Sequence, residues 1–284
     1  MIDPKTQEIQ VAPLTGLIGA EIKGLDLTRA LTEEQSSTVF QAFLDHKVLV
    51  IRGQQGISRR QFGDFCRLFG EPEIEEHPQH GADADTPEVK VLRSDAGNED
   101  EDRDSSWHMD GSTRGSDKRL WVSILRAVEV PEYGRDTAFV DMERAFYRLS
   151  ETMQTFVSGL KATHSWGWVK PGAPTSEHDV APIHSYTGRR TLYVSPFYTT
   201  DIVGLRPDES DLLLKFLLSK VHRLEHQVRV SWEPGTIVIW DNARTLHYPI
   251  MDRPFPRVMH RVMTLLPEGD GQAQGQPERE RAIA

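Results

Sequence analysis

The residues of this chain best suited to chemistry are a histidine and an aspartate two positions apart, His108 and Asp110. In a strand, side chains two positions apart point to the same side, so this imidazole and this carboxylate can converge on one cation. The His-x-Asp/Glu pattern occurs once among 11 histidines and 43 acidic residues. Because chance alone predicts roughly one or two such patterns, the pair by itself also fits a solvated histidine and aspartate at a strand end.

A third candidate ligand lies in the C-terminal third of the chain. His247 follows an apolar stretch, 236–240, that is typical of a buried strand. Two histidines and one carboxylate on one side of a metal leave three adjacent positions open, which suits non-haem Fe(II) that binds a cosubstrate and dioxygen together. The same three ligands also suit a zinc hydrolase.

Two arginines follow on the next expected strand. Arg257 and Arg261 are four positions apart, so they face the same side of the strand at a separation of about 13 Å. Arg261 is a candidate for a two-pronged salt bridge to a dicarboxylate cosubstrate. Arg257 would then meet a second anionic group at the far end of the pocket, or lie at the rim as an ordinary surface residue.

The elements that must position these residues are mostly short strands. Capping boxes predict helices over 33–45 and from Ser58 to a stop at Gly70, and apolar spacing predicts further helices at 142–149, 150–157 and from Pro207. Loops are expected at 71–87, 95–104 and 167–182. Strands are expected once before residue 32 and at 47–53, 89–92, 120–130, 137–140, 183–186, 191–194, 227–232, 236–240 and 257–266. This order predicts one mixed α/β domain, 1–284, with a jelly-roll core, flanking helices and a disordered tail at 267–284.

Composition narrows the class of protein. At 284 residues, 38% hydrophobic and 27% charged, the chain is typical of a globular protein, and its net charge of -10 argues against a nucleic-acid partner. The single cysteine, Cys66, suits a reducing compartment. The first residues lack the pattern of a secretory signal, and no apolar run approaches the ~18 residues that span a membrane. We therefore expect a cytoplasmic protein without a membrane partner, and a homo-oligomer, either a dimer or a tetramer.

Several motifs, in this order, resemble the taurine dioxygenase family, which also contains phenoxyacetate-herbicide dioxygenases and alkylsulfatases. The resemblance extends over nearly all of residues 10–266. The matching segments are Gly19-Ala20-Glu21-Ile22, Gly24-Leu25-Asp26-Leu27, Val48-Leu49-Val50-Ile51-Arg52-Gly53-Gln54, Phe69-Gly70-Glu71, Trp107-His108-Met109-Asp110, Gly134-Arg135-Asp136-Thr137, Trp240-Asp241-Asn242 through His247, and Met259-His260-Arg261.

The resemblance implies a double-stranded β-helix and dependence on Fe(II), 2-oxoglutarate and dioxygen. It implies that His108, Asp110 and His247 are the iron ligands, and that Arg261 and Thr137 hold the distal carboxylate of 2-oxoglutarate. The implied reaction hydroxylates a small organic molecule and releases succinate and CO2. Because a carboxylate at position 110 occupies the place that a halide would need, the resemblance argues against a halogenase.

The resemblance also implies substrate contacts. Arg257 matches the arginine that contacts the sulfonate in taurine dioxygenases. His77 lies close to the position of a substrate-contacting histidine, and His80 competes for the same match. Trp107 and Phe197 are candidates for the pocket wall, although a buried aromatic residue also fits plain core.

The substrate itself stays open at this point. Between Trp166 and Ile183 the chain is shorter than taurine dioxygenase and differs in sequence, so a sulfonate, sulfate ester, carboxylate or phosphonate are all candidates. Two other function classes also stay open. One is the zinc hydrolase, and the other is a catalytically inactive binding or regulatory protein on the same fold.

Overall fold

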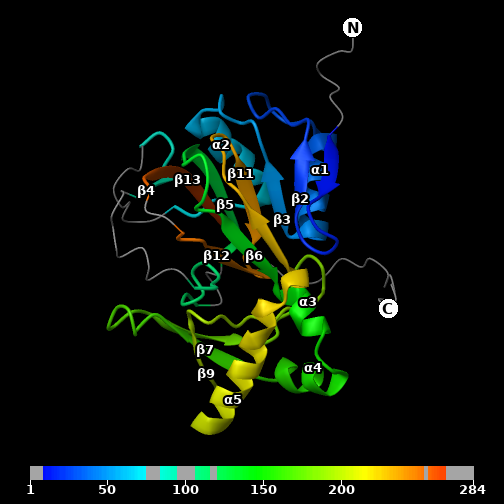
Figure 1. The fold of residues 1–284 in the computed structure, drawn as a ribbon, viewed down its shortest axis with the longest axis vertical. Coiled ribbons are helices and arrows are strands. Elements are labelled where there is room, and N and C mark those ends of the chain that lie inside the picture. Colours follow the sequence, from blue (N-terminus) through cyan, green and yellow to red (C-terminus); the bar gives the residue numbers. More distant parts are fainter. Residues whose placement is uncertain (1–8, 75–83, 95–105, 116–119, 253–254, 267–284) are drawn as a thin grey trace.

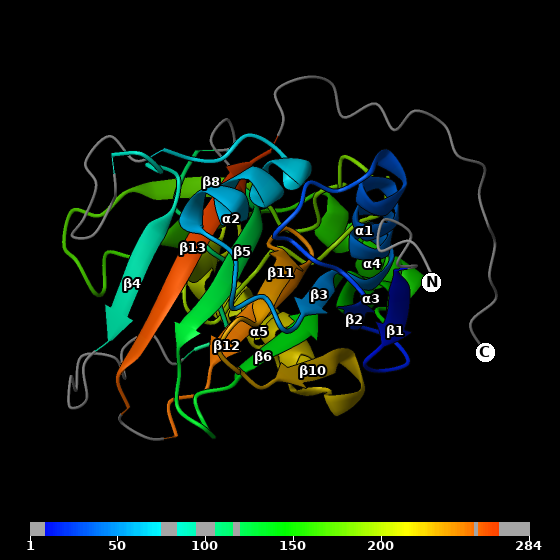
Figure 2. The ribbon, with the colours of Figure 1, turned by 90° about the horizontal axis from the view of Figure 1, so that it is seen from above.

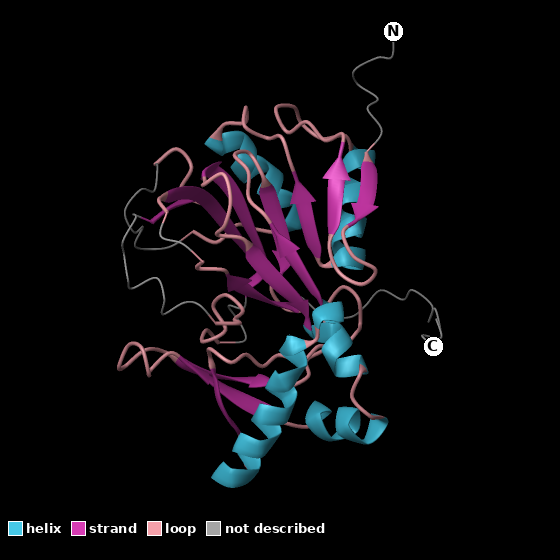
Figure 3. Ribbon diagram, viewed as in Figure 1, coloured by secondary structure: helices cyan, strands magenta, loops and turns pink. Residues whose placement is uncertain are grey.

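The computed structural model describes residues 9–74, 84–94, 106–115, 120–252 and 255–266. Strands dominate its larger part, drawn in the upper half of Figure 1, whereas helices and three short strands form the smaller part below (Figures 1 and 3). Within the described ranges, no helix is both long enough and apolar enough to cross a membrane.

The larger part contains two sheets. The seven-stranded sheet, in the order β1-β2-β3-β11-β5-β13-β4, consists of β1 (Gln10–Pro13), β2 (Ala20–Lys23), β3 (Val48–Ile51), β11 (Ile237–Asp241), β5 (Leu120–Glu129), β13 (Arg257–Leu265) and β4 (Lys90–Ser94). The second sheet, in the order β10-β6-β12, consists of β10 (Gln227–Val230), β6 (Thr137–Asp141) and β12 (Thr245–Pro249). Strands β11, β5 and β13 lie side by side in Figure 2.

The remaining elements flank these sheets. The third sheet, in the order β8-β7-β9, consists of β8 (Thr175–Asp179), β7 (Lys161–Ser165) and β9 (Thr199–Ile202). The helices are α1 (Glu33–His46), α2 (Arg59–Cys66), α3 (Met142–Tyr147), α4 (Glu151–Ser158) and α5 (Pro207–Leu218), and the 3₁₀ helices are η2 (Arg67–Phe69), η5 (Ser219–His222) and η6 (Leu224–His226).

Strand β3 shows how the layers are held together. Its residues Val48 and Val50 share a core with Phe139 of β6, which belongs to the second sheet. The alternate residues Leu49 and Ile51 pack in a different core with side chains of α1 and α2. Because side chains alternate across a strand, a continuous apolar run is what burial on both faces requires. Two sheets enclosing one core, with helices outside, confirm the predicted jelly roll.

Local sequence signals account well for the N-terminal helices. Thr32 and Gln35 form a reciprocal capping box at the start of α1, and Ser58 and Gln61 do the same for α2. Gly70 ends the η2 turn with a φ of 124°, a left-handed value that favours glycine. Both predicted helix starts and the predicted stop are therefore confirmed.

The C-terminal half of the prediction contains errors. The expected loop 167–182 includes strand β8, whose polar sequence Thr-Ser-Glu-His-Asp lacks apolar alternation and pairs with β7. The expected strands 183–186 and 191–194 are wrong, since only a single bridge joins Ile183 and Arg190, and Leu192 and Tyr193 donate singly to Met142 and Val180 instead of forming a ladder. Strands β7, β9 and β12 were not predicted. The predicted tail, 267–284, lies outside the described residues.

A buried charge network fixes the turn between β11 and β12. Arg244 donates to Asp241 Oδ2 at 2.7 Å and to the Leu44 carbonyl at 2.8 Å, and Glu143 Oε2 lies 3.5 Å from its guanidinium. Burial would raise the pKa of Asp241, but the charges of Arg244 and His184 hold it well below its usual range. The turn that carries the chain from Asp241 into β12 is therefore ordered by charge-assisted hydrogen bonds.

We predict that Arg244→Ala lowers the free energy of unfolding by about 3–5 kcal/mol, because it leaves the buried carboxylate of Asp241 without its guanidinium partner. The matched control is Arg229→Ala. Arg229 also forms an ion pair, with Asp136 at 2.6 Å, but its side chain is 57% exposed. The control should cost about 1 kcal/mol or less. Urea denaturation measures both, and equal losses in the two variants would contradict the structural role of Arg244.

Candidate metal centre and cavity

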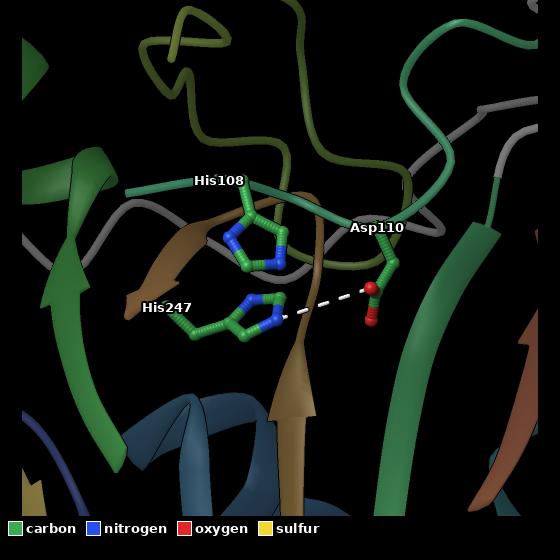
Figure 4. Close-up of side chains that lie close together, drawn as sticks. All are labelled: His108, Asp110 and His247. Atoms are coloured by element: carbon green, nitrogen blue, oxygen red, sulfur yellow. Dashed lines mark ion pairs between the residues drawn. The ribbon is translucent and has the colours of Figure 1, made fainter. Parts of the chain in front are cut away.

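The candidate metal centre begins with a backbone pair. His108 donates its N–H to the carbonyl of His247 at 3.0 Å, and His247 donates back to His108 at 2.8 Å. Residues directly opposite each other in such a pair place their side chains on the same face, and the two imidazole centroids lie 4.1 Å apart. The pairing therefore brings together two residues that are far apart in the sequence (Figure 4).

Asp110 joins the two histidines by a different route from the one expected. His108 forms an isolated bridge and a turn begins at Asp110, so the two residues do not alternate along a regular strand. One ligand atom from each of His108, Asp110 and His247 nevertheless lies within 4.8 Å of the others. Within the described ranges, no other group of histidine, cysteine, aspartate or glutamate side chains meets this condition.

The protonation and spacing of the donor atoms suit a cation. His108 Nδ1 lies 2.8 Å from the Ser106 carbonyl, which can only accept, so Nδ1 carries the proton and Nε2 keeps its lone pair. His247 Nε2 lies 3.9 Å from Asp110 Oδ1, too far for a direct hydrogen bond. A cation between these atoms would complete the arrangement, and two imidazoles with one carboxylate are suited to Fe(II).

Two side chains hold Asp110 in place. Ser123 Oγ donates to Asp110 Oδ2 at 2.6 Å. The Asn242 side-chain amide accepts from the backbone N–H of Asp110 and donates to its carbonyl, both at 2.8 Å. The peptide and the carboxylate of Asp110 are thus fixed separately, which leaves Oδ1 directed toward the histidines.

The charges of the site set the protonation states that a metal needs. Burial raises the pKa of Asp110, but His247, Arg261 and His108 outweigh it, and the pKa is lowered to about 2. Burial, followed by the charge of His108, lowers the pKa of His247 to about 3. Near neutral pH the carboxylate is therefore ionised and the His247 imidazole is neutral, as metal ligation requires.

The segment after Asp110 is tied to the smaller part of the molecule. His178 and Ser176, both on β8, lie 2.7 and 2.9 Å from the Ser112 carbonyl. Gly111 has a φ of 62°, and a Cβ there would lie 2.7 Å from Leu120, so glycine suits both the backbone and the space. Strand β8, predicted as part of a loop, is in fact an anchor for the segment that carries Asp110.

A cavity of about 260 Å³ adjoins the three donors. Thr137, Arg257 and Arg261 line it. Thr137 Oγ1 accepts a hydrogen bond from Trp232 Nε1 at 3.1 Å, so its own proton remains available for an acceptor in the cavity. The cavity thus combines three cation ligands with a hydroxyl donor and two guanidinium groups.

The two arginines have different neighbours. Arg261 lines the cavity together with the three donors, and its charge lowers the pKa of both Asp110 and His247. Its Nε is buried without a hydrogen-bond partner, and no ion pair of Arg261 is found in the described part of the chain. Arg257 lies opposite Ser94 on β4. The Ser94 hydroxyl is 3.4 Å from Nη2 of Arg135, and Arg135 precedes Thr137 by two residues.

The structure separates the other predicted substrate contacts. Phe197 packs against the His108 ring at 5.8 Å between centroids, and Trp107 packs against Tyr248 at 5.6 Å. Neither is among the described residues that line the cavity, and their role as substrate contacts stays a prediction. His77 and its competitor His80 lie outside the described residues.

Some site residues had no assigned role in the sequence. Asn242 stands in the Trp240-Asp241-Asn242 motif, but the motif does not reveal which backbone its amide clamps. Ser123 lies in the middle of β5 and had no distinguishing signal, since its hydrogen bond depends on the register that places it opposite Trp240.

A jelly roll that brings two histidines and one carboxylate within reach of one ion defines the class of mononuclear metal-dependent jelly-roll proteins. The family model described as "Taurine catabolism dioxygenase TauD, TfdA family" matches residues 10–263. The chain belongs to this family, which confirms the resemblance found in the sequence.

Known relatives align along most of the chain. An alkylsulfatase from Acinetobacter baylyi is 35% identical over 271 residues, which cover 88% of this chain and 83% of the relative. An alpha-ketoglutarate-dependent sulfate ester dioxygenase from Pseudomonas putida is 31% identical over 280 residues, which cover 91% of this chain and 90% of the relative. The crystal structure of a taurine dioxygenase from Burkholderia xenovorans has a TM-score of 0.80 and 35% identity, covering 90% of this chain and 89% of that one.

We predict that Asn242→Ala weakens Fe(II) binding by about 10–100-fold, because outer hydrogen bonds orient metal ligands. The matched control is Gln54→Ala. The Gln54 side-chain amide also bonds to backbone, since it accepts from the N–H of Leu27 at 3.0 Å and donates to the carbonyl of Leu25 at 2.8 Å. Gln54 is remote from the site. Both variants should lose stability, and only Asn242→Ala should lose affinity in anaerobic Fe(II) titration calorimetry. Equal affinities in the two variants would refute the role of Asn242.

Proposed function

We propose that this protein is an Fe(II)- and 2-oxoglutarate-dependent dioxygenase that hydroxylates a small anionic organic molecule and releases succinate and CO2. The observation that carries the proposal is the convergence of His108, Asp110 and His247 beside a cavity that also contains two arginines. Membership of the TauD, TfdA family and the sulfate ester and sulfonate dioxygenases among its relatives support it.

In this proposal the three side chains hold Fe(II), which supplies the activation of dioxygen when bound. Asp110 offers the anionic ligand, and its hydrogen bonds from Ser123 and Asn242 keep it oriented. His108 offers Nε2, because the Ser106 carbonyl holds the proton on Nδ1. Thr137 donates its hydroxyl proton to a carboxylate of 2-oxoglutarate, and a guanidinium supplies the matching positive charge.

The contacts favour Arg257 as the partner of Thr137. A hydroxyl and a guanidinium that share one carboxylate must lie close together, and Arg257 is linked to the Thr137 strand through Ser94 and Arg135. Arg261 lines the same cavity as Asp110, where it can meet the substrate. This proposal reverses the assignment made from the sequence, which gave Arg261 to the cosubstrate and Arg257 to the substrate.

The other function classes have less support. A zinc hydrolase would use the three ligands but has no need of two cavity arginines and a hydroxyl donor. An inactive binding protein would have no need of a complete donor set. A cytoplasmic location, a dimer or tetramer, and a single domain over 1–284 stay predictions.

We predict that His108→Ala, Asp110→Ala and His247→Ala each abolish the weak visible absorption band that Fe(II) and 2-oxoglutarate form together under anaerobic conditions. The band requires both molecules on one metal centre, and each variant removes a ligand. The control is His226→Ala, which removes a buried histidine of η6. If all three ligand variants kept the band and turnover, the metal assignment would be wrong.

We predict that Arg257→Ala raises the 2-oxoglutarate concentration needed to half-saturate this band by roughly 30-fold or more, since losing one partner of a desolvated ion pair costs ~2–5 kcal/mol. Arg261→Ala should change it much less. The titration needs no organic substrate, so it tests the cosubstrate assignment alone. A large effect in Arg261→Ala with none in Arg257→Ala would restore the sequence-based assignment.

A further inference from the structure

A second cation lies beside Arg261. Lys90 on β4 is the direct cross-strand partner of Arg261 on β13, and residues paired in this way have side chains on the same face. Leu92 and Ser94, two and four residues after Lys90, line the cavity. Arg261 also lines the cavity, and Lys90 shares its face of the sheet.

The pKa of Lys90 responds to the charges around it. Its pKa is lowered to about 8, first by burial and then by the charge of Arg261, while Glu73 and Asp110 act in the opposite direction. Arg114 also acts on Lys90 and is itself ion-paired with Glu73. The cross-strand pairing itself places Lys90 beside Arg261, so two cationic side chains share one face of the sheet.

Two adjacent cations of different shape can distinguish anions of different shape. A guanidinium meets two oxygens with two parallel hydrogen bonds, which uses both oxygens of a carboxylate. A tetrahedral oxyanion presents a third oxygen to a second donor, and a lysine ammonium, a compact point charge on a flexible stem, can meet it. The pair thus offers more to a tetrahedral head group than to a planar one.

We propose that Lys90 and Arg261 form a two-cation subsite that selects substrates with a tetrahedral oxyanion, such as a sulfate ester, over carboxylates. The proposal rests on the proposed function and on the assignment of Arg261 to the substrate. It makes Lys90 a specificity-determining residue, because Arg261 alone would serve either head group.

The test uses the protein loaded with Fe(II) and 2-oxoglutarate without oxygen, and two probes of similar chain length, hexyl sulfate and heptanoate. Binding is measured by titration calorimetry at fixed ionic strength. Lys90→Met removes the charge and keeps an unbranched side chain. Lys23→Met is the matched control, since Lys23 is an exposed residue at the end of β2. Lys90→Arg tests rescue of the charge.

We expect Lys90→Met to weaken hexyl sulfate binding by about tenfold, the equivalent of ~1.4 kcal/mol, with less than a twofold change for heptanoate. Lys90→Arg should keep the preference for sulfate, and Lys23→Met should change nothing. The proposal is overturned if the unaltered protein binds neither probe. It is also overturned if Lys90→Met weakens the binding of both probes equally, or if this variant weakens the binding of 2-oxoglutarate instead. The visible Fe(II)–2-oxoglutarate band reports separately on the proposed function, because its absence from the unaltered protein would refute that function and not only the subsite.

Discussion

The site depends on one interaction, the reciprocal backbone hydrogen bonds between His108 and His247. These two bonds join the segment that carries Asp110 to the second sheet, and they fix the distance between the imidazoles. Backbone pairing of this kind depends on register more than on side chains, so the elements that set the register of β12 determine the geometry of the metal centre. The turn after β11, held by Asp241 and Arg244, is the closest of these elements.

Electrostatic balance explains why so many charges are tolerated inside this fold. Asp241 is compensated by Arg244, and Asp110 is surrounded by two histidines and Arg261. The charges of the first group compensate each other within the protein, and they order the turn between β11 and β12. The second lies beside a cavity lined by the guanidinium groups of Arg257 and Arg261, which is the electrostatic character expected where anionic ligands bind beside a metal.

The sequence predicted the parts of the fold that depend on local signals. The capping boxes of α1 and α2 and the doubly buried run of β3 carry their own information, and the order of motifs indicated the metal ligands. Strand β8 could not be found, because a polar edge strand is defined by its partner and not by its own pattern. The roles of Arg257 and Arg261 were also beyond the sequence. Both share a strand face, and only the contacts of Ser94 and Arg135 distinguish their neighbours.

The anchor between β8 and Ser112 has a consequence for the diversity of this architecture. His178 and Ser176 reach a main-chain oxygen, so the joint does not depend on which side chain occupies position 112. Trp168 donates to the Phe197 carbonyl at 3.1 Å, and the Phe197 ring packs against His108, so it is the stretch after Trp168, residues 169–174, that can change in length and composition while the joint stays intact. New recognition loops can thus be grafted at this place without rebuilding the metal centre, which makes it a natural point for divergence and for protein engineering.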